Sequence, residues 1–146
     1  MVFVSITRLR LRSALYLLPF LWHAFRSGNQ IVKANGFIKG KTLMDKKITF
    51  WTMSLWADEI AMRTYRNTDA HKKAMPKLQH WCDEASVINW KQDEAEFPDW
   101  QMSYQKMLAE GRLSKVKHPS PDHAKSQFPA PRYPSKTERI LLPGTT

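Results

Sequence analysis

The sequence of 146 residues contains only one cysteine, Cys82. A single cysteine excludes an intramolecular disulfide and any metal site built from several thiolates, and it is typical of a reducing compartment. A zinc-finger spacing, a glycine-rich phosphate loop and an RNA-binding aromatic signature are also missing from the sequence. We therefore expect no metal site and no specific nucleic-acid binding.

Acidic residues are scarce in the first third of the chain. Residues 1–50 contain Asp45 as their only carboxylate, and the whole chain has a formal net charge of +10. Such a surplus favours anionic partners, namely phosphates, acidic lipid headgroups or an acidic protein. A solvated basic surface explains the same surplus more simply, so the charge alone identifies no partner.

The sequence also lacks a long hydrophobic run. The segment ALYLLPFLW follows three arginines and imitates a signal peptide, but Pro19 interrupts it and no small-x-small cleavage site follows. It is too short to span a bilayer, which requires about 20 apolar residues. We expect a cytoplasmic protein, with peripheral membrane contact left open because an apolar patch beside arginines can lie at a membrane interface.

Hydrophobic patterning predicts an alternation of strands and helices. Asp58 and Thr68 are expected helix N-caps, and Pro76 is expected to kink or break the second helix of the pair. Asp83 and Glu84 are interpreted as a solvated turn. The expected order is strand 2–11, helix 20–32, strand 37–44, strand 48–56, a helix from 58 that restarts at 69, and strand 86–92.

This order is β-α-β-β-α-β, so the predicted fold class is α+β with a ferredoxin-like domain over residues 1–92. The two helices cover one face of the sheet. The other face must be buried as well, most simply by a second copy of the same sheet, which predicts a homodimeric α+β barrel. The ligand cavity is expected between the sheet and the helices of each subunit.

The character of the chain changes after residue 92. Residues 93–118 are predicted to form a helical extension, with Trp100, Tyr104 and Met107 on one side. Residues 119–146 hold six of the nine prolines and are expected to be an extended or disordered tail. The segment PAPRYPSK within the tail is a candidate docking segment for a partner protein.

Four segments carry a resemblance to a known family: ITRLRLRS, ANGFIKGKTLMD, FWTMSLWADEIAMRTYRN and DAHKKAMPKLQHWCDEASVINW. Residues 1–92 resemble the antibiotic-biosynthesis-monooxygenase superfamily of dimeric α+β barrels. Within it they look most similar to proteins related to spheroidene monooxygenase. The resemblance implies oxygen chemistry on aromatic, polyene or quinone-like substrates, without a cofactor in some members and with heme in others.

The heme-degrading branch of this superfamily uses an asparagine, a tryptophan and a histidine. Alignment to that triad places Thr7, Tyr65 and Met75 at these three positions. All three residues differ, so we do not expect heme degradation by that mechanism, although heme stays a candidate cofactor.

The segment YRNTDAHKKAM, residues 65–75, contains the main site candidates. His71 is predicted as an acid/base group or axial heme ligand, with Arg66 and Met75 as further cofactor contacts and Tyr65 and His23 as catalytic orienting groups. Each of these side chains has an alternative role in ordinary helix packing. The expected walls of the substrate cavity are Trp22, Phe25, Trp51, Trp56 and Leu78.

Taken together, the sequence predicts a monooxygenase-like protein acting on an apolar, aromatic or polyene/quinone-like substrate. The alternative is a non-catalytic module that binds a small apolar ligand or heme and docks to a partner through its tail.

Overall fold

The computed structural model describes residues 1–144, apart from the side chains of Asp69 and Ala70. Its strands form one antiparallel sheet in the order β5-β4-β1-β3-β2-β6. The elements are β1 (Val2–Leu11), the 3-10 helix η1 (Ala14–Tyr16), α1 (Leu17–Ile31), β2 (Phe37–Asp45), β3 (Thr49–Trp56), α2 (Glu59–Arg66), α3 (Asp69–Trp81), β4 (Cys82–Gln92), α4 (Trp100–Glu110), β5 (Arg112–Leu113) and β6 (Arg139–Leu141).

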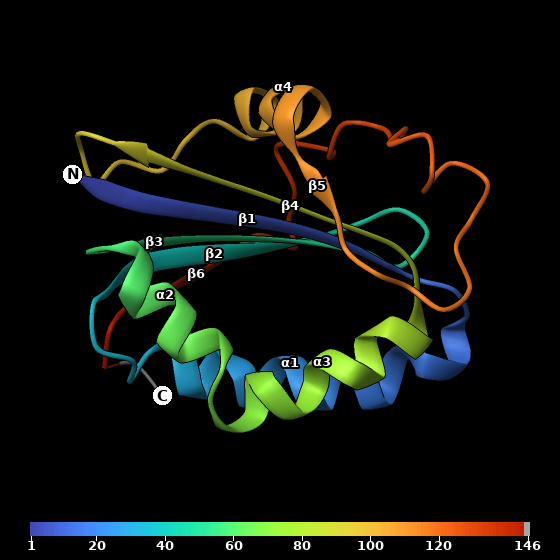
Figure 1. The fold of residues 1–146 in the computed structure, drawn as a ribbon, viewed down its shortest axis with the longest axis horizontal. Helices are drawn as coiled ribbons and strands as arrows, with labels where there is room; N and C mark the ends of the chain where they lie inside the picture. The colour runs from blue at the N-terminus through green and yellow to red at the C-terminus, as the bar shows by residue number, and fades with distance from the viewer. Residues whose placement is uncertain (145–146) are drawn as a thin grey trace.

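The predicted β-α-β-β-α-β order and the α+β class are confirmed. β1 is central, paired with β3 on one side and β4 on the other, and β2 and β3 form the expected hairpin. Helices α1, α2 and α3 lie on one side of the sheet, and α4 lies on the other (Figure 1).

Side chains along β1 alternate between two hydrophobic clusters, as the period of a strand requires. Val4 and Ile6 face the cluster beneath α4, whereas Phe3 faces the cluster beneath α1 and α2. Both faces of the sheet are therefore buried, which explains why apolar residues occur at odd and even positions of this strand.

The second face of the sheet is covered by the chain's own extension. Trp100 and Met107 of α4 are buried against it, and the rings of Trp100 and Phe128 each lie 6.1 Å from the ring of Trp51. The extension also adds β6 to the edge of β2. Residues 93–141 thus supply the burial that the sequence analysis assigned to a dimer partner.

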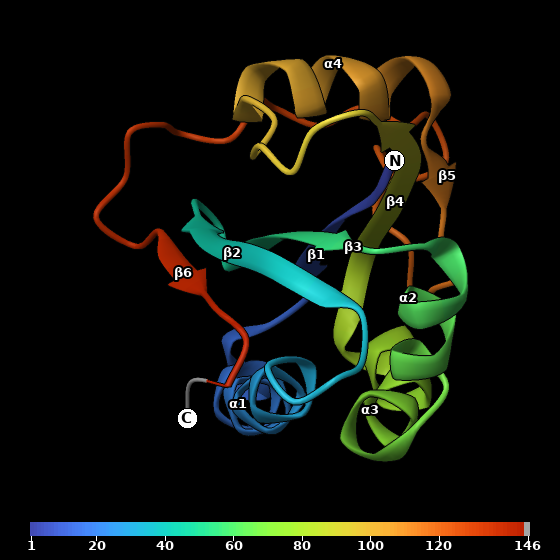
Figure 2. The same cartoon turned by 90° about the vertical axis from the view of Figure 1, so that its left-hand side faces the viewer.

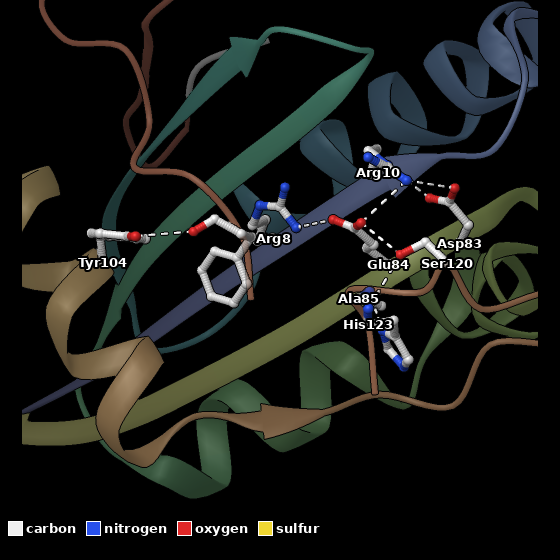
Figure 3. A network of polar contacts seen from close by, with 9 residues as sticks. Arg8, Arg10, Asp83, Glu84, Ala85, Tyr104, Ser120 and His123 are labelled. Atoms are coloured by element: carbon white, nitrogen blue, oxygen red, sulfur yellow. Dashed lines mark hydrogen bonds and ion pairs between the residues drawn. The ribbon is translucent and has the colours of Figure 1, made fainter. Parts of the chain in front are cut away.

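The expected turn at Asp83 and Glu84 is wrong, because β4 begins at Cys82 and includes both residues. Arg8 on the neighbouring β1 carries a charge into the sheet, and Glu84 neutralises it at 2.7 Å. Ser120 of the extension donates a second hydrogen bond of 2.7 Å to Glu84, and Arg10 pairs with Asp83 (Figure 3). The strand is longer than its apolar pattern suggests because its polar residues have buried partners.

Helix α3 restarts after Thr68 as predicted and continues through Pro76 to Trp81, so no break occurs at the proline. No helix in the range 1–144 is long and apolar enough to cross a membrane.

Candidate functional site

The break between α2 and α3 brings Tyr65 and His71 together. Tyr65 lies in the last turn of α2 and His71 lies in the first turn of α3. The centroids of the two rings are 4.9 Å apart. A continuous helix separates residues six apart by more than a turn, so the break between α2 and α3 is what produces this contact. Thr68 occupies the N-cap position, but its hydroxyl donates back to the carbonyls of Thr64 and Tyr65 and makes no capping hydrogen bond.

The two rings extend an aromatic column that begins on the sheet. Phe37 contacts Trp56 at 5.4 Å between ring centroids, and Trp56 contacts Tyr65 at 5.3 Å. The indole N–H of Trp56 donates to Ser54 Oγ at 2.9 Å, which fixes the indole orientation. We call Phe37, Trp56, Tyr65 and His71 the aromatic column.

Gln30 of α1 fixes the junction from the other side. Its amide nitrogen donates to the carbonyl oxygens of Tyr65 at 2.9 Å and Thr68 at 2.8 Å, and its amide oxygen accepts from the backbone N–H of His71 at 3.0 Å. Gln30 is not among the site residues that the sequence predicts. The one feature of the sequence that could have pointed to Gln30 is its position: it is a polar residue beside the apolar Ile31, near the end of an apolar helix.

The local electrostatics keep both ring groups neutral. Burial lowers the pKa of His71, and its Nδ1 lies 3.2 Å from the carbonyl oxygen of Arg66. That carbonyl only accepts, so the proton resides on Nδ1 and Nε2 is left as an acceptor. Burial raises the pKa of Tyr65, whose hydroxyl donates to the carbonyl of Ser27 at 3.2 Å.

A pocket of about 910 Å³ lies between α1 and α2, with Gln30, Tyr65 and Thr68 in its wall. We call it the helix pocket. Its charged lining consists of Arg26, Lys33, Lys73 and Asp58, so cations exceed carboxylates. His71 is not part of the lining and lies behind Tyr65 and Gln30.

The remaining predicted cavity residues do not share this pocket. Trp51 and Trp56 are five residues apart on β3, so they point to opposite faces of the sheet, and Trp51 is buried beneath α4. Trp22 and Phe25 lie on the outer face of α1, 59% and 62% exposed. Leu78 packs in a separate cluster with Phe20 and Cys82.

His23 and Met75 are also separate from the aromatic column. The His23 ring lies 5.5 Å from that of Trp81, at the last residue of α3, and its Nε2 is 3.3 Å from Lys77 Nζ. Burial, followed by the charges of Lys77 and Arg26, lowers the pKa of His23. Met75 lies on the exposed side of α3.

These positions do not fit heme. An axial imidazole requires a flat apolar slot beside it, but the His71 ring is packed against Tyr65, and Trp22, Phe25 and Trp51 point elsewhere. Within the described part of the chain, no group of three or more histidine, cysteine or carboxylate side chains is arranged to hold a metal ion.

Comparison with known proteins finds similarity in structure alone. No family profile matches the chain, and no curated protein matches its sequence. A variant of SnoaB, a cofactor-independent oxygenase from Streptomyces nogalater, superposes with a TM-score of 0.54 at 14% identity, covering 67% of this chain and 98% of that one. A conserved protein from Methanosarcina mazei Go1 superposes with a TM-score of 0.57 at 14% identity, covering 64% and 94%.

A structure described as an antibiotic biosynthesis monooxygenase superposes with a TM-score of 0.56 at 13% identity, covering 64% of this chain and all of that one. At such identities the likeness concerns the fold, which does not by itself determine function. The protein therefore shares the α+β fold of these three structures.

Proposed function

We propose that the protein is an oxygenase-like enzyme that acts without heme on a small, electron-rich aromatic substrate carrying an ionisable oxygen. The observation that carries this proposal is the helix pocket. It is an open groove on the surface rather than an enclosed cavity, so a flat ligand would lie against its wall with one side facing solvent. Tyr65 is part of the wall and joins the pocket to the aromatic column.

The cations of the pocket suit the anionic form of such a substrate. Arg26, Lys33 and Lys73 line the pocket together with Asp58 as the only carboxylate of its charged lining. Cations near an ionisable group stabilise its deprotonated form and lower its pKa. The anion of an electron-rich ring is the form that reduces oxygen most readily, so charge stabilisation is the main catalytic contribution that these side chains offer.

The proposed reaction balances without a cofactor. A ring methylene made acidic by a conjugated carbonyl loses a proton to solvent, and the carbanion transfers an electron to O₂. Recombination gives a peroxide, and loss of water from it leaves a new carbonyl. One oxygen atom of O₂ enters the product, and the other leaves as water.

His71 has a positioning role in this proposal, because Tyr65 and Gln30 separate it from the pocket. Its ring supports Tyr65, and its backbone N–H holds the Gln30 amide oxygen. His71→Gln is therefore expected to raise KM more than it lowers kcat and to leave the pH profile of kcat unchanged. A loss confined to kcat would instead indicate direct proton transfer by the imidazole.

Oxygen consumption with anthrone and with dihydroxynaphthalenes, in the presence of a chelator, tests the proposal. We expect turnover above the autoxidation rate, and one ¹⁸O atom from ¹⁸O₂ in the quinone that forms from the ring methylene of anthrone. The double variant Lys33→Gln/Lys73→Gln should lose about tenfold in kcat/KM, whereas Lys46→Gln, an exposed lysine outside this pocket, serves as the matched control. Rates equal to autoxidation for the whole panel would contradict the enzymatic proposal.

A second candidate function is non-catalytic binding of an organic anion. It is favoured by the hydrogen bonds of Gln30 and Tyr65, which commit the polar atoms of these two side chains to the fold. The cations of the lining would then hold the anion. Native mass spectrometry distinguishes the two: a retained small molecule with no turnover supports binding alone.

A homodimer stays a prediction, made from the expectation that the second face of the sheet needs a second copy to cover it. Light scattering at micromolar concentrations tests it, and a dimer would have to use a surface other than the sheet face that α4 covers.

A further inference from the structure

The outer face of η1 and α1 carries large apolar side chains that are exposed to solvent. The exposed fractions are 84% for Leu15, 79% for Leu18, 41% for Leu21, 59% for Trp22 and 62% for Phe25. We call these five residues the α1 outer face. The opposite side of the same helix packs on the core through Phe20 and Ile31, so the helix is apolar on both sides.

These side chains form one continuous patch. Leu15, Leu18, Trp22 and Phe25 follow the three- and four-residue spacing that places side chains on one helical stripe. The rings of Trp22 and Phe25 are stacked with their centroids 6.3 Å apart. Contiguous exposed apolar patches on this scale mark interaction sites, whereas isolated exposed apolar residues do not.

The surroundings of the patch are cationic. Residues 12–33, which include all of η1 and α1, contain Arg12, Arg26 and Lys33 and no acidic residue. Helix α3 runs beside α1 (Figure 2) and places Lys77 next to His23, 3.3 Å from its Nε2. An apolar patch flanked by cations and free of carboxylates is complementary to an anionic surface with an apolar interior.

We propose that the α1 outer face docks on the surface of an anionic lipid bilayer. Tryptophan, phenylalanine and leucine enter the boundary between headgroups and acyl chains, and the flanking cations pair with acidic headgroups. The helix lies in the plane of the interface, consistent with the finding that no helix in the described part of the chain is able to span a bilayer.

A second copy of the chain is a less suitable occupant. Stacking two α1 outer faces brings Arg12, Arg26 and Lys77 of both copies together without a carboxylate on this helix to pair with them. Like charges placed together oppose association, and the net charge of +10 adds to this repulsion at long range. Acidic headgroups remove the same repulsion.

Co-sedimentation with vesicles tests the proposal, using pure phosphatidylcholine and phosphatidylcholine with about 30% phosphatidylserine. We expect binding to the anionic vesicles and at least tenfold weaker binding at high salt. The variant Trp22→Ser/Phe25→Ser should bind at least tenfold more weakly. Ile60→Ser removes an apolar side chain of α2 that is 76% exposed and should leave binding unchanged.

Tryptophan fluorescence tests whether Trp22 inserts into the bilayer. Trp22 is the one tryptophan among the exposed large apolar residues in the described chain. Its emission should shift to shorter wavelength and be quenched by brominated lipid, and Trp22→Phe should abolish this quenching while the protein still sediments with vesicles.

Three outcomes would overturn the proposal. The first is folded wild-type protein that stays in solution with anionic vesicles at low salt. The second is equal binding by wild type and Trp22→Ser/Phe25→Ser. The third is a dimer in solution that this double substitution converts to monomer, because that result would assign the α1 outer face to a second copy.

Discussion

Arg8 lies in the middle of β1 with its guanidinium almost completely buried. Its Nη1 is 2.7 Å from Glu84 Oε1, and the guanidinium carbon lies 4.6 Å from the centre of the Phe128 ring. Burial alone would raise the pKa of Glu84, but hydrogen bonds from Arg8 and Ser120 and the charges of Arg8 and Arg10 outweigh burial and lower it. Glu84 therefore stabilises the fold while it is ionised, and this contribution is lost as the pH falls below the normal carboxylate range.

Glu84→Gln is expected to reduce the free energy of unfolding by about 3 kcal/mol, because it leaves a buried guanidinium without its counter-charge. Urea denaturation at neutral pH measures this change. The control is Glu59→Gln, which removes an exposed ion pair with Arg63 and should cost less than about 0.5 kcal/mol. Equal effects of the two substitutions would contradict the structural role of Glu84.

His71 should also make the stability of the protein depend on pH. Here the fold favours the neutral form of the side chain, whereas at Glu84 it favours the charged form. Burial lowers the pKa of His71 in the folded state, so between that pKa and the normal value of about 6.5 the unfolded chain binds more protons. Stability is fully present above pH 6.5 and falls as the pH drops. His71→Gln should lose less stability than wild type between pH 8 and pH 5.5. The remaining decline belongs to His23 and His80, whose pKa values are also lowered. Identical declines would contradict this assignment.

At the scale of elements, the junction of α2 and α3 shows what sequence patterns predict well. Asp58 caps α2 by accepting from the backbone N–H of Ala61, and the restart after Thr68 is where the sequence predicts it. Residues close together in the sequence determine where these two helices begin. The contact of Gln30 with Tyr65 joins residues 35 apart in sequence, and no pattern of one helix specifies it.

Gln30→Leu should destabilise this junction by about 1–3 kcal/mol, chiefly because the His71 N–H loses its acceptor. The carbonyls of Tyr65 and Thr68 each lose one donor but keep backbone N–H donors. Hydrogen exchange should accelerate at the His71 amide more than at amides of β1. Asn29→Leu, at the neighbouring position in the same pocket wall, is the control. Unchanged exchange at His71 would show that Gln30 does not hold the junction.

At the scale of the whole molecule, the sequence predicted the order of strands and helices in residues 1–92. It did not predict that α4 covers the second face of their sheet. The β-α-β-β-α-β order follows from patterns of local period, which are readable in one sequence. Burial of the second sheet face by α4 depends on contacts between Trp51 and both Trp100 and Phe128, which are distant in the sequence. The placement of the cavity residues failed for a simpler reason: two tryptophans an odd number of residues apart on one strand face opposite ways.

Removal of the chain after Gln92 should expose the face that contains Trp51 and Met53, both fully buried in the intact protein. We expect the shortened protein to aggregate or self-associate, measured by light scattering, since a sheet face of this size is not stable in water. Trp100→Ala keeps the length of the chain and should cost about 3–5 kcal/mol. A shortened protein that stays monomeric with an unchanged melting temperature would contradict the role of the extension.

Binding of an aromatic ligand in the helix pocket is tested most directly by amide NMR of ¹⁵N-labelled protein titrated with a dihydroxynaphthalene. We predict saturable shifts at Gly36, Ala61 and Thr64 in the pocket lining, weakened in Lys33→Gln/Lys73→Gln. Amides around Lys47 and Arg132, which line a separate pocket, should not move. Shifts confined to Lys47 and Arg132, or none at the helix pocket up to millimolar ligand, would contradict the proposed site.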